Sequence, residues 1–228
     1  MRCSRPLARP RRLRPLRAAA VTATIPVGSR PYAVAANPLT GTVYLANFAS
    51  DNVSVIANAT CATTVTGTHS GPPTIGPGTT CVEPGAVITG PVTITAGGAA
   101  LIQGATLQGP LQANHAAGLA VCGTTIDGAV SIVNATGPVV LGGGAGSGCA
   151  PDTLGGAVAL TGNTTGVVLA GNTIGGAVAL TRNTTEVVVA GNTISGSLSC
   201  NGNDPAPADN GQPNTVTGLA SGQCSALA

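Results

Sequence analysis

Hydrophobic and polar residues alternate along most of the chain, and in its C-terminal half the alternation repeats with a fixed period. Residues 155–174 read GGAVALTGNTTGVVLAGNTI and residues 175–194 read GGAVALTRNTTEVVVAGNTI, so 17 of 20 positions are identical. Within each unit, the runs G-x-V-x-L and V-V-L predict short strands, while the Asn-Thr and Gly-Asn pairs predict corners. Such a repeat is typical of a solenoid, in which each coil buries its apolar face against its neighbours.

The apolar residue that closes each unit extends the repeat on both sides of these two copies. The equivalent positions are Ile88, Leu107, Ile126, Leu154, Ile174, Ile194 and Val216. The two longest steps contain insertions, at 142–151 and around 204–212, and without them the period is roughly 19–20 residues. The pattern therefore predicts an all-β fold over 86–228, a right-handed parallel β-helix of about six coils.

A different pattern precedes the coils. Residues 21–60 contain four alternating or apolar runs separated by Gly, Pro, Asn and Asp, namely Val21–Ile25, Tyr32–Ala36, Thr42–Ala46 and Asn52–Ile56. These runs predict a four-stranded β-meander with a hairpin turn at 37–41. Residues 61–85 contain four prolines among Thr and Gly, and we interpret them as a linker.

Charge is concentrated at the N-terminus. Seven of the nine arginines lie in the first 17 residues, and the chain has no lysine. Three interpretations of this basic arm (residues 1–20) are open: a degraded leader or misplaced start, a functional export signal, and an arm that binds nucleic acid or anionic lipid. The first is favoured because the arm lacks the apolar run of an export signal. We therefore do not expect nucleic-acid binding, and without a run of 18 apolar residues we expect no transmembrane segment.

Six of the seven cysteines lie in the body of the chain, and none belongs to a CxxC pair or to a zinc-like spacing with His. Disulfide bonds are the favoured interpretation, and they imply an exported protein. Cys122 and Cys149 fall at the same corner of neighbouring coils, and Cys200 and Cys224 at similar offsets from the closing residue of theirs, which suits the short Cα separation of a bridge. The expected bonds are Cys122–Cys149, Cys200–Cys224 and, by elimination, Cys61–Cys81.

The N-terminal meander contains the approach TIPVGSRPYAVAANP, the tetrapeptide Tyr44-Leu45-Ala46-Asn47 and the closing run DNVSVIA. This stretch resembles one repeat of the YVTN family of β-propellers, with Leu and Ala where the family motif has Val and Thr. The resemblance implies a single propeller blade. Because propellers close a ring of several blades, either the chain is a fragment of a longer protein or the blade docks on the next domain.

The C-terminal part, which includes GNTISGSLSCNGNDPAPADNGQPNTVTGLASGQC, resembles the ends of secreted β-helical proteins of Gram-positive bacteria. Most of those proteins have no known function. This resemblance spans residues 86–224 and implies a secreted or cell-surface bacterial protein. It supplies an architecture and no catalytic motif.

Few residues of the coils suggest chemistry. Asn163 and Asn183 recur at the period, as do Asn172 and Asn192, and we expect their amides to stack into structural ladders at the corners. Asp204 and Asp209 share one insertion and form a candidate recognition loop, or a paired-carboxylate site.

The remaining ionisable residues give no catalytic pattern. Asp127 and Asp152 are scattered, Arg182 is the only arginine in the coils, and His69 and His115 have no nucleophile partner in a recognisable motif. We therefore expect no catalytic residue, metal or cofactor.

These features favour a non-catalytic, exported or cell-surface structural and interaction protein that displays loops on a β-solenoid. Its partner would be a protein or a cell-envelope component, and the chain would be a monomer or part of a larger chain. Two alternatives remain open: a degenerate pectin-lyase-like enzyme that acts on polysaccharides, and a truncated fragment of a larger YVTN propeller protein. The absence of aromatic residues beyond Phe48 argues against sugar binding, because sugar sites commonly stack on aromatic rings.

Overall fold

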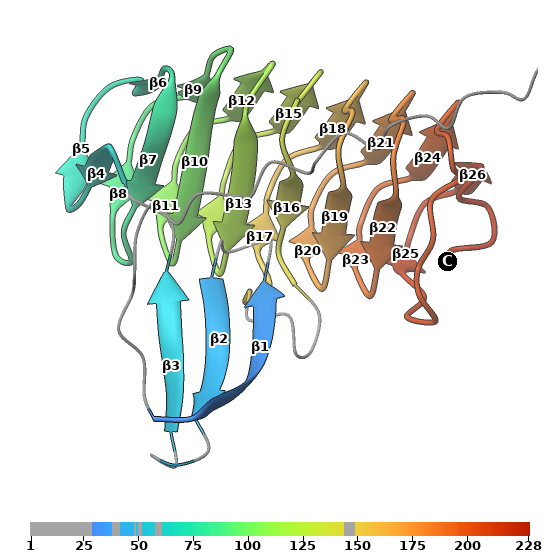
Figure 1. Ribbon diagram of the computed structural model, residues 1–228. Helices are drawn as coiled ribbons and strands as arrows, with labels where there is room; N and C mark the ends of the chain where they lie inside the picture. The colour runs from blue at the N-terminus through green and yellow to red at the C-terminus, as the bar shows by residue number, and fades with distance from the viewer. Residues whose placement is uncertain (1–28, 38–41, 48, 50–51, 58–60, 144–148) are drawn as a thin grey trace, which may run out of the picture. The chain divides into compact units, whose positions relative to one another are not determined.

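The computed structural model describes residues 29–37, 42–47, 49, 52–57, 61–143 and 149–228, and every regular element in these ranges is a β-strand. The strands form one three-stranded sheet and, separately, a solenoid of three parallel sheets (Figure 1). The predicted all-β solenoid is confirmed.

The three-stranded sheet consists of β1 (Pro31–Asn37), β2 (Thr42–Asn47) and β3 (Asn52–Ala57). Its order is β1-β2-β3, so strands that are consecutive in sequence are neighbours, as in a meander. The fourth expected strand, Val21–Ile25, and the basic arm at 1–20 lie outside the described residues. The assignment of this sheet to a propeller blade stays a prediction.

The coils of the solenoid contribute strands to three sheets, named here sheets I, II and III, and the last coil has strands only in sheets II and III. Sheet I contains β4 (Thr63–Val65), β7 (Gly78–Val82), β10 (Gly98–Gln103), β13 (Gly118–Cys122), β16 (Val139–Leu141), β19 (Val167–Ala170) and β22 (Val187–Ala190). Sheet II contains β5 (Thr68–His69), β8 (Val87–Ile88), β11 (Thr106–Leu107), β14 (Thr125–Ile126), β17 (Thr153–Leu154), β20 (Thr173–Ile174), β23 (Thr193–Ile194) and β25 (Thr215–Val216).

Sheet III contains β6 (Thr74–Ile75), β9 (Val92–Ile94), β12 (Leu111–Asn114), β15 (Val130–Val133), β18 (Val158–Thr161), β21 (Val178–Thr181), β24 (Leu198–Asn201) and β26 (Ala220–Gly222). Sheets II and III each have eight strands, so the solenoid has about eight coils. At the usual ~4.8 Å between paired strands, the stack is about 34 Å long.

The closing apolar residues of the repeat lie side by side in sheet II. Leu107 pairs with Ile88 on one side and with Ile126 on the other. The row continues through Leu154, Ile174, Ile194 and Val216. The register derived from the sequence is therefore confirmed. The row also begins one coil earlier than expected, because His69 pairs with Ile88.

Residues 61–85 form the start of the solenoid, where the sequence suggested a linker. β4 pairs with β7 from Thr63 to Val65, and β5 and β6 are the first strands of sheets II and III. This segment adds one coil, and the seven closing positions from Ile88 to Val216 supply the other seven strands of sheet II, so the solenoid has about eight coils where about six were predicted. Its four prolines fall between strands, where a missing backbone N–H does not interrupt a ladder.

Inward-facing aliphatic side chains of the three sheets fill the solenoid. Ile88, Leu107, Ile126, Leu154 and Ile174 are completely buried in sheet II. The hydrophobic core of the described residues contains Val, Ile, Leu, Ala and Cys and no aromatic side chain. Because residues of similar shape recur at the same height of each coil, they stack in rows and each coil covers the next.

The paired glycines before the sheet III strands have a steric explanation. A Cβ added to Gly176 would lie 2.5 Å from the backbone nitrogen of Ala157 and 2.7 Å from its Cα. A Cβ at Gly196 would lie equally close, 2.5 Å, to the backbone nitrogen of Ala177. Only glycine allows this corner to approach the preceding coil so closely.

Candidate functional site

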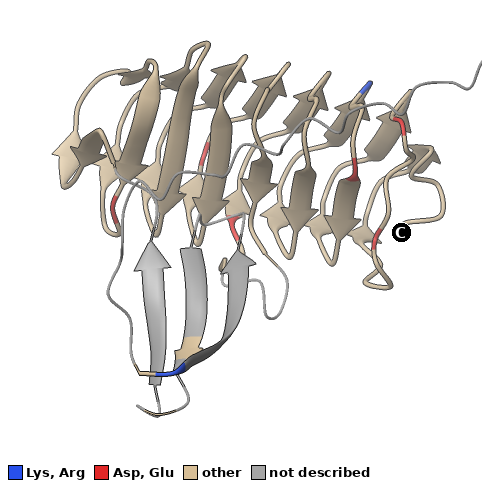
Figure 2. Cartoon of the chain, in the orientation of Figure 1, with Lys and Arg blue, Asp and Glu red and all other residues tan. Residues whose placement is uncertain are grey.

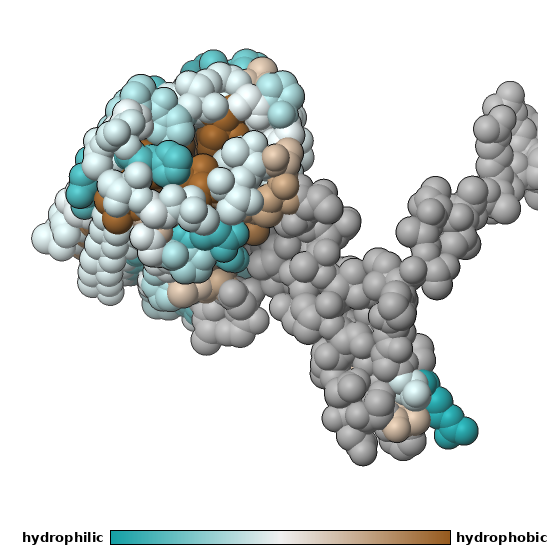
Figure 3. Space-filling model, turned by 90° about the vertical axis from the view of Figure 1, so that its left-hand side faces the viewer, coloured by the Kyte–Doolittle hydropathy of each residue, from teal (hydrophilic) through white to brown (hydrophobic). Residues whose placement is uncertain are grey.

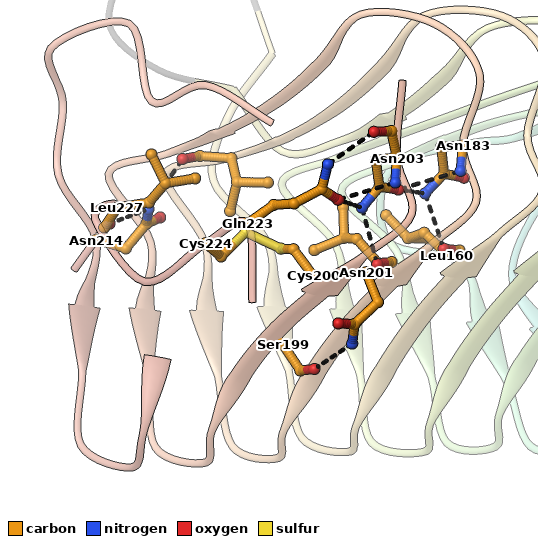
Figure 4. The surroundings of a disulfide bond; sticks show 12 residues. Leu160, Asn183, Ser199, Cys200, Asn201, Asn203, Asn214, Gln223, Cys224 and Leu227 are labelled. Carbon is orange, nitrogen blue, oxygen red and sulfur yellow. Dashed lines mark hydrogen bonds between the residues drawn. A yellow bond between two sulfur atoms is a disulfide. The ribbon is translucent and has the colours of Figure 1, made fainter. Parts of the chain in front are cut away.

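A first ladder of amide side chains runs along the corner between sheets III and I. Asn163 Nδ2 donates a hydrogen bond to Asn183 Oδ1 over 2.8 Å, and Asn183 Nδ2 donates to Asn203 Oδ1 over 2.8 Å. The same oxygens accept from the backbone N–H groups of Asn163 (3.0 Å) and Asn183 (3.1 Å). Gln223 ends the column, because its Oε1 accepts from the Asn203 backbone N–H and its Nε2 donates to the Asn203 carbonyl (Figure 4).

A second ladder runs along the corner between sheets I and II. The backbone N–H of Asn172 donates to Asn192 Oδ1 over 3.0 Å, and that of Asn192 donates to Asn214 Oδ1 over 3.1 Å. Asn192 Nδ2 donates to Asn214 Oδ1, and Asn214 Nδ2 donates to the Leu227 carbonyl, both over 2.8 Å. The three asparagines are buried, so these contacts satisfy polar groups that water does not reach. The repeated asparagines therefore have a structural role, because they pair buried backbone groups of neighbouring coils.

Asp152 is the first rung of this second ladder. Its side chain is 1% exposed, Oδ1 accepts from the backbone N–H of Thr124 over 2.9 Å, and its own N–H donates to Asn172 Oδ1 over 2.8 Å. Burial raises the pKa of its carboxyl to about 7, and backbone N–H donors from Thr124, Gly142 and Gly123 offset only part of that effect. Its second oxygen, Oδ2, is buried without a hydrogen-bond partner among the described residues.

Three disulfide bonds link neighbouring coils, and they are the three pairs expected from the sequence. The bonds are Cys61–Cys81, Cys122–Cys149 and Cys200–Cys224, with Cα separations of 5.6, 5.0 and 5.3 Å. The second bond attaches Cys149, in the insertion at 142–151, to β13 of the preceding coil, and the third joins β24 to the C-terminal segment beside the end of the first ladder (Figure 4). The C-terminal end is further covered by Leu227, which packs partly buried against the core.

The two acids of the candidate recognition loop have separate local environments. Asp204 is exposed, and its backbone N–H donates to the Asn183 carbonyl at the corner between sheets III and I. Asp209 follows Ala208, which pairs with Val188 of sheet I, and its Oδ1 accepts from the backbone N–H of Gly211 over 3.0 Å. No hydrogen bond between described residues joins the two acids, so we assign them no shared chemistry.

The outer face of sheet III carries a hollow of about 610 Å³ over β9, β12 and β15. Gln112 lies in its middle and pairs in register with Thr93 and Ser131. At its edge, Nδ1 of His115 lies 2.7 Å from Oδ1 of Asn114, so that ring nitrogen is the donor. The lining also includes Thr95, and its polar side chains are amides, hydroxyls and one imidazole, with no carboxylate and no arginine. Ile94, Ala96, Ala113 and Val133 add apolar surface. Such a surface matches an uncharged, hydrogen-bonding ligand.

Charges are sparse on the solenoid, and Figure 2 shows the acids dispersed along it. A row of threonines lies in register on sheet II, at 106, 125, 153, 173, 193 and 215. No cluster of three or more metal-ligating residues occurs in the part of the chain that the structure describes. Within the same ranges, no helix is long and apolar enough to span a membrane.

The N-terminal end of the solenoid is hollowed. Figure 3 views the solenoid from this end and shows apolar residues inside a rim of polar ones. A cavity of about 160 Å³ lies there. Val65, Ile75, Val82 and Ile88 are among the residues that line it.

Comparisons with protein-family models, curated proteins and solved structures found no match for this chain. The resemblance to a YVTN blade therefore rests on the residues quoted for it. The fold itself defines the class of protein, a disulfide-bonded parallel β-solenoid.

Several residues of these sites were not singled out from the sequence. Asn203 follows Asn183 by 20 residues and Asn214 follows Asn192 by 22, so the period itself contained the signal for both ladder extensions. Gln223 continues the first ladder, because it follows Asn203 by 20 residues. The hollow on sheet III had no such signal, because Gln112 and Asn114 occur in an irregular coil.

Proposed function

We propose that this protein is a non-catalytic interaction protein of the cell exterior, in which the solenoid is a rigid support. It binds an uncharged, hydrogen-bonding partner of the cell envelope through the hollow on sheet III. The observation that carries this proposal is the neutral lining of that hollow, with Gln112, Asn114 and His115 at its centre and edge. The three disulfides are compatible with the extracellular location that it requires.

Rigidity supports this use of the sheet. The strands under the hollow are held on both sides by paired neighbours, β6 before them and β18 after them. Inward-facing residues of the same strands, such as Leu111 and Ile132, are completely buried. The backbone of such a sheet loses little further conformational freedom on binding, which favours affinity.

Co-sedimentation of the oxidised protein with isolated cell-envelope material tests the proposal. The double variant Gln112→Ala/Asn114→Ala should bind about tenfold or more weakly, because each lost hydrogen bond contributes about 1 kcal/mol. Asn201→Ala is the matched control, since Asn201 is an exposed amide at the end of the last long strand of the same sheet. Equal sedimentation of the double variant and the wild type would contradict the proposal.

Polysaccharide cleavage is a separate candidate with its own test. The two acids in the C-terminal insertion are the residues that such an activity would need. The Asp204 backbone pairs with Asn183 of the preceding coil, whereas the Asp209 carboxylate accepts within a local turn. We expect no release of reducing ends from a panel of polysaccharides. Cleavage that disappears in Asp204→Asn or Asp209→Asn would overturn the non-catalytic assignment.

A further inference from the structure

Each rung of the second ladder needs one acceptor and one donor on its side chain. Asn192 shows both: its Oδ1 accepts from the N–H of the preceding rung, and its Nδ2 donates to the Leu169 carbonyl over 2.8 Å. Asn172 has the same arrangement one coil earlier, with Nδ2 donating to the Leu141 carbonyl over 2.8 Å. The donor always reaches the sheet I strand of the coil before.

Asp152 occupies this position with a carboxyl group in place of an amide. Its Oδ1 accepts from Thr124 N–H as an asparagine oxygen would, which leaves Oδ2 in the place of the donor. Leu169 pairs with Leu141, and Leu141 pairs with Val121, so the register makes the Val121 carbonyl the acceptor for this rung. This carbonyl already accepts from the Gly142 N–H over 2.9 Å, and the rung would supply its second hydrogen bond. An ionised carboxylate has no hydrogen for that carbonyl, whereas a neutral carboxyl group has one.

We propose that Asp152 is a proton-operated latch, whose neutral carboxyl group completes the ladder and holds the segment Cys149–Leu154 against the neighbouring coils. Ionisation leaves a buried, unpaired charge at the same place, and the segment loosens. The buried Oδ2 without a partner and the 1% exposure of the side chain are the observations that carry this inference.

No neighbouring charge compensates for an ionised Asp152. Apart from the bonded cysteines, the other ionisable residues between 101 and 174 are His115 and Asp127. His115 follows β12 of sheet III. Asp127 follows β14 of sheet II, at the corner between sheets II and III, and both residues are exposed. In the next coil, Arg182 and Glu186 are also exposed. Desolvation therefore decides the protonation of Asp152.

The sign of the pH dependence follows from the raised pKa. The folded protein keeps a proton on Asp152 up to a pKa of about 7, whereas the unfolded chain releases it near 3.8. The folded state therefore binds more protons between these two values, and its stability falls as the pH rises through that window. In the folded protein the latch is closed in acid, half of the molecules have ionised Asp152 near pH 7, and the latch is open in more alkaline solution.

Two measurements test the latch on the full chain with its disulfides intact. In the wild type, the Asp152 carboxyl carbon should titrate near neutral pH by nuclear magnetic resonance. At about pH 8, the Thr124 amide should exchange its hydrogen about tenfold or more faster in the wild type than in Asp152→Asn. The variant carries the same amide as the neighbouring rungs and keeps the ladder closed at every pH.

Asp127→Asn is the matched control, because it neutralises an exposed acid of the adjoining coil. It should retain the wild-type pH dependence of Thr124 exchange. A carboxyl carbon of Asp152 that titrates below about pH 5 would overturn the proposal, even if Asp152→Asn failed to fold. Equal pH dependence in the wild type and Asp152→Asn would overturn it as well.

Discussion

Asn183 donates two hydrogen bonds to a single oxygen of Asn203, one from its backbone nitrogen over 3.1 Å and one from Nδ2 over 2.8 Å. The Nδ2 group also donates to the Leu160 carbonyl over 3.0 Å. The Asn183 side chain thus bonds two backbone groups of the preceding coil, the Asn163 N–H and the Leu160 carbonyl, and one side-chain oxygen of the next coil. The strands supply the hydrophobic core, and the asparagines hold the corners.

Removal of one rung should destabilise the solenoid strongly. Asn183→Ala leaves the Asn163 N–H and the Leu160 carbonyl without their partners, so we expect the free energy of unfolding to fall by about 3 kcal/mol. Denaturant unfolding measures this loss. The exposed Asn201→Ala should change stability by no more than about 0.5 kcal/mol. Equal effects of the two variants would contradict a structural role for the ladder.

Glycine is required at one corner and dispensable at another. In Gly176→Ala the new methyl group meets the backbone of Ala157 at 2.5 Å, and we expect a loss of about 3 kcal/mol or a failure to fold. Gly166→Ala is the matched control, since no atom lies within 4 Å of its added Cβ. It should leave the melting temperature unchanged or raise it slightly. A tolerated Gly176→Ala would show that these coils are farther apart than described.

The Cys122–Cys149 disulfide should contribute measurably to stability. Cys122 and Cys149 are separated by 27 residues in sequence, so their bond restricts a sizeable loop of the unfolded chain. We expect the double variant Cys122→Ser/Cys149→Ser to lose about 3 kcal/mol in denaturant unfolding. Cys3→Ser is the control, because Cys3 belongs to none of the three pairs. If both variants unfolded at the same denaturant concentration, the bond would have no stabilising role.

Truncation distinguishes a first coil from a linker at residues 61–85. A chain that begins at residue 86 lacks Val65, Ile75 and Val82, which are buried in the core, and exposes Ile88 to water. Its melting temperature, followed by circular dichroism, should be lower than that of a chain that begins at residue 61. A linker would be removed without effect, so equal melting temperatures would contradict the observed start of the solenoid.

The regular part of this fold is predictable because the repeat contains its own register. Ile174 and Ile194 pair in sheet II as the near-identical units require, and the same spacing led to the cysteine pairs. The first coil was missed because residues 61–85 contain four prolines among Thr and Gly, which indicated a linker, and because β6 is shorter than the later strands of sheet III. The hollow on sheet III was missed for another reason, since it is formed by residues of three coils with no common motif.

The sequence alone determined the period, the closing aliphatic row, the cysteine pairs and the repeated asparagines, because stacked coils convert equal spacing along the chain into proximity in space. Only the tertiary structure decided how Asp152 is used. In sequence it is an isolated acid after an insertion, and its spacing from Asn172 gives no hint of its ionisation state. The fold places it in the amide ladder with one oxygen buried and unpartnered, and desolvation then determines its chemistry.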